Sequence, residues 1–162
     1  MLSEEIGDLS KRVLNKARVN KIRIVTAESC TGGLIAASLT EIPGSSDVIE
    51  CGFIVYSDNA KSRLLDVPQE LLERVGAVSE EVARAMVKGA LENSDAQLGI
   101  AVTGIAGPSG GSVLKPVGLV HVAAGRSGQE IQHRACSFGD AGRAQVRMFT
   151  VEAALKLLLR VM

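Results

Sequence analysis

Apolar positions along this chain follow two spacings, one typical of amphipathic helices and one typical of buried strands. Residues 3–19 carry apolar residues three and four positions apart, which predicts a helix. Residues 22–26 are mostly β-branched and predict a buried strand. Helical spacing returns over residues 31–41, and a strand is predicted over residues 48–56 after a Pro-Gly-Ser-Ser turn.

The second half of the chain has the same alternation, followed by two consecutive strands. Three further helices are predicted over residues 58–65, 68–74 and 79–91, the first with Asp58 as its cap. Strands are predicted over residues 98–102, 117–124 and 130–137, the last two joined by a hairpin loop at residues 125–128. Residues 143–161 are predicted to form a long amphipathic final helix.

This order of elements predicts an α/β fold. Helices alternate with strands early and a hairpin closes the sheet late, which indicates a three-layer α/β/α sandwich with a mixed, mostly parallel sheet of about five strands. The 162 residues are expected to form a single domain, 1–162. Ligands bind at the carboxyl ends of parallel strands in such sheets. Ser29 and Thr103 both follow predicted strands, so their two glycine-containing loops are expected to meet at one crevice.

Composition excludes several classes of function. The formal net charge is zero and the chain has no Trp and one Tyr, which argues against binding nucleic acid. The three cysteines show no C-x-x-C spacing, and His121 and His133 have no partner at ligand spacing, so no disulfide framework, metal or cofactor is expected. Acidic residues near the N-terminus and the lack of a long apolar run predict a cytoplasmic protein without signal peptide or membrane span.

Candidate chemistry concentrates in residues 28–33, between the first predicted strand and helix. A strand that enters a helix through a tight turn directs backbone N–H groups and the helix dipole at a ligand. The Ser29 hydroxyl is placed there to attack or bind a carbonyl; alternatively, Ser29 and Thr31 only cap the helix. The candidate nucleophiles are Ser29, Cys30, Thr31 and Thr103.

A serine nucleophile needs a base, and no carboxylate pairs with either histidine to make a triad. Lys61 is the remaining candidate, because a desolvated lysine can lose its proton; the alternative is a solvated surface lysine. Tyr56 could hold that lysine, donate to an oxyanion, or simply end its strand.

The segment from Thr103 to Ser112 is dense in glycine and offers backbone N–H groups suited to a phosphate or ribose, although an ordinary surface loop has the same composition. It matches neither the Walker nor the dinucleotide-binding glycine pattern. Arg143 and Arg147 lie four residues apart on one face of the final helix, where either could reach an anion or be solvated.

Taken together, these residues resemble the C-terminal domain of the competence/damage-inducible protein CinA, the nicotinamide-nucleotide amidohydrolase family. The matching motifs are T-A-E-S-C-T-G-G (26–33), P-G-S-S (43–46), G-x-x-x-Y-S-x-x-x-K (52–61), G-A-V-S-E-x-V-A (76–83), A-V-T-G-I-A-G-P-x-G-G (101–111), K-P-V-G-x-V (115–120) and R-x-x-V-R (143–147). The resemblance covers nearly the whole chain and implies the stand-alone form, without the N-terminal domain often fused in this family.

The resemblance implies deamidation of nicotinamide mononucleotide to nicotinate mononucleotide and ammonia, without metal or cofactor. It makes Ser29 the nucleophile and Lys61 the base, with Tyr56 nearby. The N–H groups of residues 30–32 would hold the oxyanion, and Arg143 takes the place of the family's arginine after a two-residue shift. The substrate-binding residues expected from it are Glu28, Cys30, Thr31, Gly32, Gly33, Thr103, Gly104, Gly107, Ser109 and Arg143.

The expected partners are the small nucleotide substrate and further copies of the chain in a homo-oligomer, with no nucleic acid and no membrane. A second interpretation stays open, because a fold by itself proves no reaction. The chain could be a non-catalytic nucleotide-binding or regulatory module related to competence or DNA damage.

Overall fold

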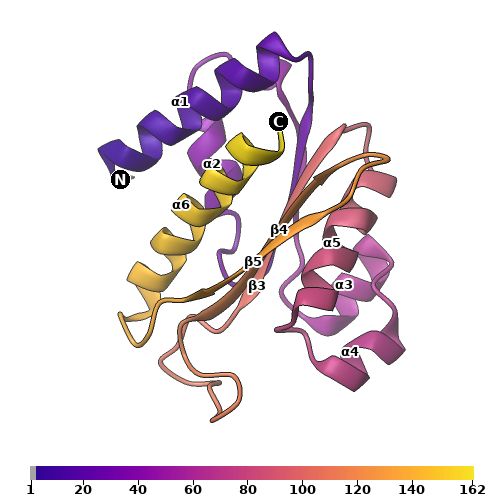
Figure 1. Ribbon diagram of the computed structural model, residues 1–162, viewed down its shortest axis with the longest axis vertical. Coiled ribbons are helices and arrows are strands. Elements are labelled where there is room, and N and C mark those ends of the chain that lie inside the picture. The colour runs from indigo at the N-terminus through magenta and orange to yellow at the C-terminus, as the bar shows by residue number, and fades with distance from the viewer. Residues whose placement is uncertain (1–2) are drawn as a thin grey trace.

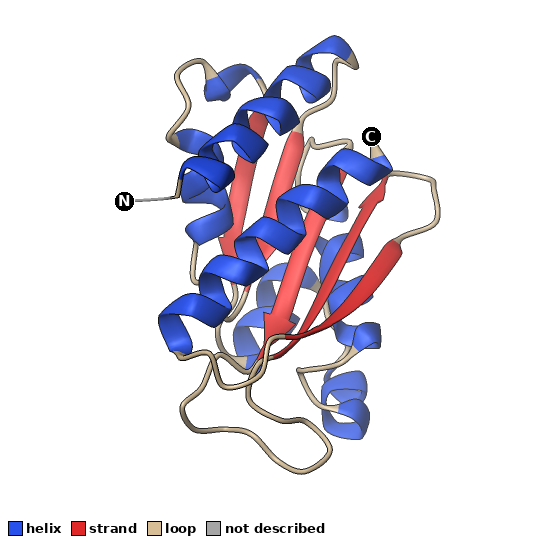
Figure 2. Cartoon of the chain, turned by 60° about the vertical axis from the view of Figure 1, so that its left-hand side comes forward, coloured by secondary structure: helices blue, strands red, loops and turns tan. Residues whose placement is uncertain are grey.

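A five-stranded sheet between two layers of helices makes up the computed structural model, which describes residues 3–162 (Figure 1, Figure 2). The strand order is β2-β1-β3-β4-β5. Strands β1 (Ile24–Glu28), β2 (Ile49–Ile54) and β3 (Leu98–Gly104) run parallel. Strands β4 (Leu119–Arg126) and β5 (Gln132–Ser137) continue the sheet antiparallel. Three of the five strands are therefore parallel, as the predicted mixed sheet requires.

Helices cover both faces of this sheet, which confirms the predicted three-layer sandwich (Figure 1). On one face lie α1 (Glu4–Val19), α2 (Leu34–Thr40) and α6 (Arg143–Val161). On the other lie α3 (Asp58–Leu65), α4 (Gln69–Val75) and α5 (Glu80–Glu92). A single 3-10 turn, η1 (Ser45–Asp47), precedes β2. Within residues 3–162 the structure contains no helix of the length and apolarity needed to cross a membrane.

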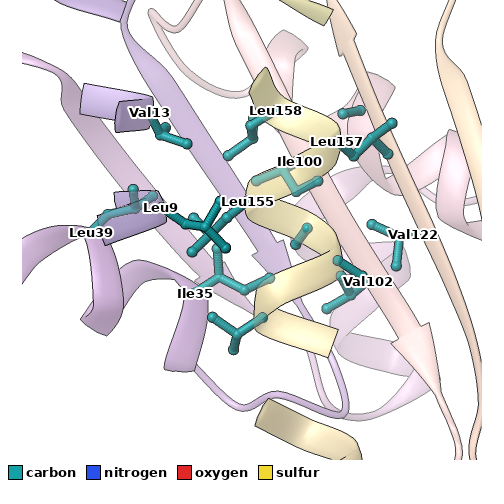
Figure 3. Close-up of a cluster of buried hydrophobic side chains, with 14 of the residues drawn as sticks. Leu9, Val13, Ile35, Leu39, Ile100, Val102, Val122, Leu155, Leu157 and Leu158 are labelled. Carbon is teal, nitrogen blue, oxygen red and sulfur yellow. The ribbon is translucent and has the colours of Figure 1, made fainter. Parts of the chain in front are cut away.

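The core consists of two clusters, one on each face of the sheet. Figure 3 shows the first, in which Leu155 and Leu158 of α6 pack over Ile100 of β3 and against α1 and α2. The second joins α3 and α5, which touch closely because Gly89 has no side chain; a Cβ there would lie 1.8 Å from the Leu65 carbonyl oxygen. This contact fixes α3, the helix that carries Lys61, against α5, which packs on the sheet.

Two predicted boundaries near the first strand are wrong. The strand ends at Glu28 rather than residue 26, and α2 begins at Leu34 rather than residue 31. Ser29 and Thr31 do not cap α2, because its N-cap position is Gly33, at φ +98°. The N–H groups of this helix instead donate to the carboxylate of Glu28, so the turn over residues 29–33 is separate from the helix.

Two further predictions are wrong: the bounds of the hairpin loop between the last two strands and the residue that caps α3. Gly125 and Arg126 belong to β4, where they pair with Gly99 and Leu98, so the hairpin loop begins only at residue 127. The cap of α3 is Ser57 rather than Asp58, since Ser57 Oγ accepts a hydrogen bond from the Ala60 N–H at 3.1 Å. The Asp58 carboxylate is thereby left available for Lys61.

Candidate active site

A cavity of about 260 Å³ opens at the carboxyl ends of the parallel strands, where β1 lies between β2 and β3. Ligands bind at such a switch point in open α/β sheets. The lining residues come from the loops after β1, β2, α4 and β3, from the end of β3, and from the starts of α3 and α6: Ser29, Cys30, Tyr56, Asp58, Lys61, Ala77, Val78, Thr103, Gly104, Ile105, Ala106, Gly107, Ser109, Gly110 and Arg143. The loops after β1 and β3 therefore meet at one crevice.

Ser29 lies directly after β1 with its backbone held on both sides. Its N–H donates to the Val102 carbonyl at 3.1 Å, and its own carbonyl accepts from the Gly32 N–H at 3.1 Å. The residue is 8% exposed and lines the cavity. Its position in the turn is thus fixed by the sheet while part of it stays accessible from the cavity.

Cys30, the rival nucleophile, is buried beside Ser29. Burial raises the pKa of its thiol to about 11, although the N–H groups of Cys30 and Thr31 act to lower it. Since the thiolate is the reactive form, this thiol is a poor nucleophile at neutral pH.

Lys61 is the largest fully buried side chain of the described residues, at 1% exposed. Its Nζ donates to the Tyr56 carbonyl at a long 3.4 Å and lies 3.8 Å from the Asp58 carboxylate. Burial lowers the pKa of Lys61, because the charged form loses its hydration, while Asp58 and the Cys30 thiol act in the opposite direction. The Asp58 side chain is 57% exposed, so solvent weakens its attraction for the ammonium.

Tyr56 and Arg143 lie together at the exposed rim of the cavity. Arg143 Nη2 donates to the Tyr56 hydroxyl at 2.7 Å, and its Nη1 donates to the Gly107 carbonyl at 3.0 Å. A guanidinium has five N–H donors, so these two bonds leave others for a bound anion. The Tyr56 side chain contacts the arginine, and it is the Tyr56 backbone that contacts Lys61.

Four residues expected to bind substrate do not line the cavity. Glu28, Thr31, Gly32 and Gly33 lie behind it, in the packing between the turn and α2. Glu28 is fully buried and its carboxylate accepts hydrogen bonds from the protein itself, so it is not available to a ligand. The Gly32 N–H is also engaged, which removes it from the expected oxyanion donors and leaves those of Cys30 and Thr31.

On the other side of the cavity, the Thr103 hydroxyl donates to the Ala77 carbonyl at 2.9 Å. Because its proton is engaged in this bond, Thr103 lines the cavity without offering a free nucleophile. Gly104, Gly107 and Ser109, which the resemblance assigns to substrate binding, line the cavity. Asp58 and the turn Ala77-Val78 also line it and were not among the expected residues. The spacing of Asp58 three residues before Lys61 could have indicated the pair, whereas Ala77 and Val78 have no chemical signature in the sequence.

Four other polar side chains, those of His121, His133, Glu80 and Arg147, lie outside the cavity lining. His121 Nδ1 and His133 Nε2 are 2.9 Å apart, and His133 Nδ1 lies 3.3 Å from a Glu80 carboxylate oxygen. Arg147 Nη2 donates to the Thr31 carbonyl at 2.8 Å. Within the described part of the chain, no three His, Cys, Asp or Glu side chains are arranged to hold a metal ion.

Comparisons with known proteins place this arrangement in one family. Residues 7–162 match the CinA C-terminal domain. The chain is 46% identical to "Nicotinamide-nucleotide amidohydrolase PncC" from Pseudomonas putida over 97% of each chain. It is 45% identical to the "Putative competence-damage inducible protein" of Caldicellulosiruptor bescii, over 97% of this chain but only 39% of that longer protein.

Solved structures agree with this assignment. A competence/damage inducible protein from Agrobacterium tumefaciens superposes with a TM-score of 0.98 at 45% identity, covering 99% of this chain and 98% of that one. A CinA superfamily protein from Escherichia coli gives a TM-score of 0.92 at 34% identity, covering 100% and 94% of the two chains.

Proposed function

The chain belongs to the CinA C-terminal domain family, and we propose that it hydrolyses nicotinamide mononucleotide to nicotinate mononucleotide and ammonia. The similarity to the Pseudomonas putida amidohydrolase along nearly the whole of both chains supports this reaction. The observation that carries the mechanism is the buried Lys61, whose pKa is lowered and which shares one cavity with Ser29. Residues 1–162 act in this proposal as one catalytic domain.

In the proposed first step, Ser29 Oγ attacks the carboxamide carbon of the substrate. Neutral Lys61 accepts the serine proton and passes a proton to the departing ammonia. The C–N bond breaks as a nicotinoyl ester forms on Ser29. A water molecule, deprotonated by Lys61, then hydrolyses this ester and restores the serine. Neither step uses a metal or a cofactor.

The oxyanion that forms in both steps needs hydrogen-bond donors that are already in place. The N–H groups of Cys30 and Thr31 are suited to this role, because within residues 3–162 neither donates to a backbone carbonyl. Arg143 is the exposed cation at the rim, and we assign it to the substrate phosphate through the donors that Tyr56 and Gly107 leave free. The homo-oligomer expected from the sequence stays a prediction.

The experiment is release of ammonia from nicotinamide mononucleotide by the purified protein. The Ser29→Ala protein should lose several orders of magnitude in kcat, because the covalent route disappears, and should still bind the substrate. Cys30→Ala is the matched variant at the neighbouring position and should keep most of the activity. A dead Cys30→Ala beside an active Ser29→Ala would reverse the assignment, and binding without ammonia release by the wild type would support the non-catalytic alternative.

A further inference from the structure

Glu28 is an acidic residue that lies next to Ser29 but does not line the cavity. It ends β1, and none of its surface is exposed. Its Oε2 accepts from Thr31 Oγ1 at 2.6 Å and from the N–H groups of Gly33 and Ile35 at 3.0 Å each. Its Oε1 accepts from the Ala36 N–H at 2.8 Å. A carboxylate has about four acceptor sites, so this one is saturated by its own chain.

These bonds join the end of β1 to the start of α2. The first N–H groups of a helix have no partner inside it, and the N-cap glycine of α2 has no side chain to supply one. The Glu28 carboxylate provides the missing acceptor for these N–H groups, from five to eight residues earlier in the chain. It also lies at the positive end of the helix dipole. The hydrogen bonds of Glu28 therefore restrain residues 29–33 where this segment leaves β1 and where it enters α2.

Two contacts from distant parts of the chain complete this restraint. The Ser29 N–H is bound to the Val102 carbonyl in β3, and Arg147 of α6 donates to the Thr31 carbonyl. Within the described residues, the N–H groups of Cys30 and Thr31 donate to no backbone carbonyl. Both lie near the Cys30 thiol, which lines the cavity.

We propose that Glu28 is a positioning residue of the active site, whose carboxylate fixes the turn after Ser29 so that the Cys30 and Thr31 N–H groups are held ready for the oxyanion. The inference rests on the proposed function. Donors that are fixed before the reaction stabilise the developing charge without reorganising, which is the basis of oxyanion-hole catalysis. A turn that could relax would give up part of that stabilisation while leaving the rim contacts to the substrate in place.

The test is the Glu28→Gln protein, in which an amide of the same shape replaces the carboxylate. Its NH2 group faces N–H donors, so at least one of the four hydrogen bonds must be lost. Loss of one oxyanion donor lowers kcat by roughly 10²–10³-fold. Glu28→Gln only loosens the Cys30 and Thr31 N–H donors, so its kcat should fall by about 10–100-fold. We expect KM to change by less than about threefold. The rising limb of the pH–rate profile should stay where it is, since Lys61 is untouched.

A control separates positioning from simple loss of stability. Leu39 is a fully buried residue of the apolar core and lies near the end of α2, whereas the bonds to Glu28 are at its start (Figure 3). The Leu39→Ala protein should melt at a lower temperature and keep the wild-type kcat when assayed well below its midpoint. If Glu28→Gln does not fold, Thr31→Val and Thr31→Ser replace it as a pair. Only the serine keeps a hydroxyl for Glu28, so Thr31→Ser should be several times more active than Thr31→Val.

The outcomes distinguish this inference from the proposed function. A wild-type protein that releases no ammonia overturns both, since the inference rests on that reaction. An active wild type with an unchanged kcat in folded Glu28→Gln overturns only the positioning role. The same holds if KM rises alone, if Leu39→Ala loses kcat in step with its stability, or if the two Thr31 variants are equally active.

Discussion

Replacing Lys61 by methionine should make the protein inactive and, at neutral pH, more stable. The lysine is 1% exposed, and its Nζ reaches the Tyr56 carbonyl and the Asp58 carboxylate only at 3.4 and 3.8 Å. Methionine has a similar length, is unbranched and needs no polar partner. The substitution therefore removes a group that is costly to bury and keeps the volume that it fills.

The size of the effect follows from these contacts. Exchanging a poorly compensated buried charge for an apolar side chain of similar volume stabilises proteins by about 1–4 kcal/mol. The lost attraction to the exposed Asp58 is worth about 0–1 kcal/mol, which leaves a net gain of about 0–4 kcal/mol with a central value of about 2 kcal/mol. For a chain of this size, a gain of about 2 kcal/mol should raise the melting temperature by roughly 4–8 °C.

The gain should also depend on pH, and the sign follows from the lowered pKa of Lys61. Between that folded-state pKa and the ordinary value near ~10.4, the unfolded chain binds one more proton than the folded protein. Wild-type stability therefore rises with pH in this window, by up to about 1.4 kcal/mol per pH unit, and is lowest below it. The methionine variant lacks this slope, so its advantage should shrink as the pH approaches ~10.

Urea unfolding of both proteins at a series of pH values, with ammonia release measured in parallel, tests this reasoning. Curves of unfolding free energy that stay parallel from neutral pH to ~10 would show that the pKa of Lys61 is not lowered in the folded state. A Lys61→Met protein that still deamidates the substrate would refute the role of Lys61 as base.

Two further predictions concern the reaction. Activity should rise with pH along a single limb, because only neutral Lys61 can accept the serine proton. The Lys61→Arg protein should be nearly inactive at every pH in that range, since arginine does not give up its proton. An arginine variant with most of the wild-type rate would mean that the side chain at this position only supplies charge. Arg143→Ala should raise KM for nicotinamide mononucleotide by about tenfold. The KM for nicotinamide riboside, which lacks the phosphate, should change much less. Equal changes in KM for both substrates would show that Arg143 does not bind the phosphate.

Periodicity predicted the elements well where a whole face is buried. The spacing predicts the final helix at residues 143–161, as in the structure, because its apolar positions match the core against which it packs. The errors lie at ends that distant groups decide. The start of α2 is set by a carboxylate in β1, and the end of β4 by pairing with Leu98. Neither partner is visible in the local pattern.

The sequence likewise indicated where the cavity would be but not the part that each residue plays. The run Glu28-Ser29-Cys30-Thr31 is recognisable as one motif, yet Ser29 and Cys30 line the cavity while Glu28 and Thr31 face away from it. Consecutive side chains of a turn point in different directions, and the hydrogen bond between Glu28 and Thr31 holds those two side chains outside the cavity lining.

By itself, the sequence determined the α/β class, the alternation of strands and helices, and the two loops that carry the candidate chemistry, because these follow from spacing and residue type over short stretches. The tertiary structure alone decided that Lys61 is buried with a lowered pKa and that Arg143 meets Tyr56, a residue 87 positions away in the chain. A side chain's hydration and its hydrogen-bond partners depend on every element packed around it, and the packing of α3, α5 and α6 on the sheet exists only in the folded chain.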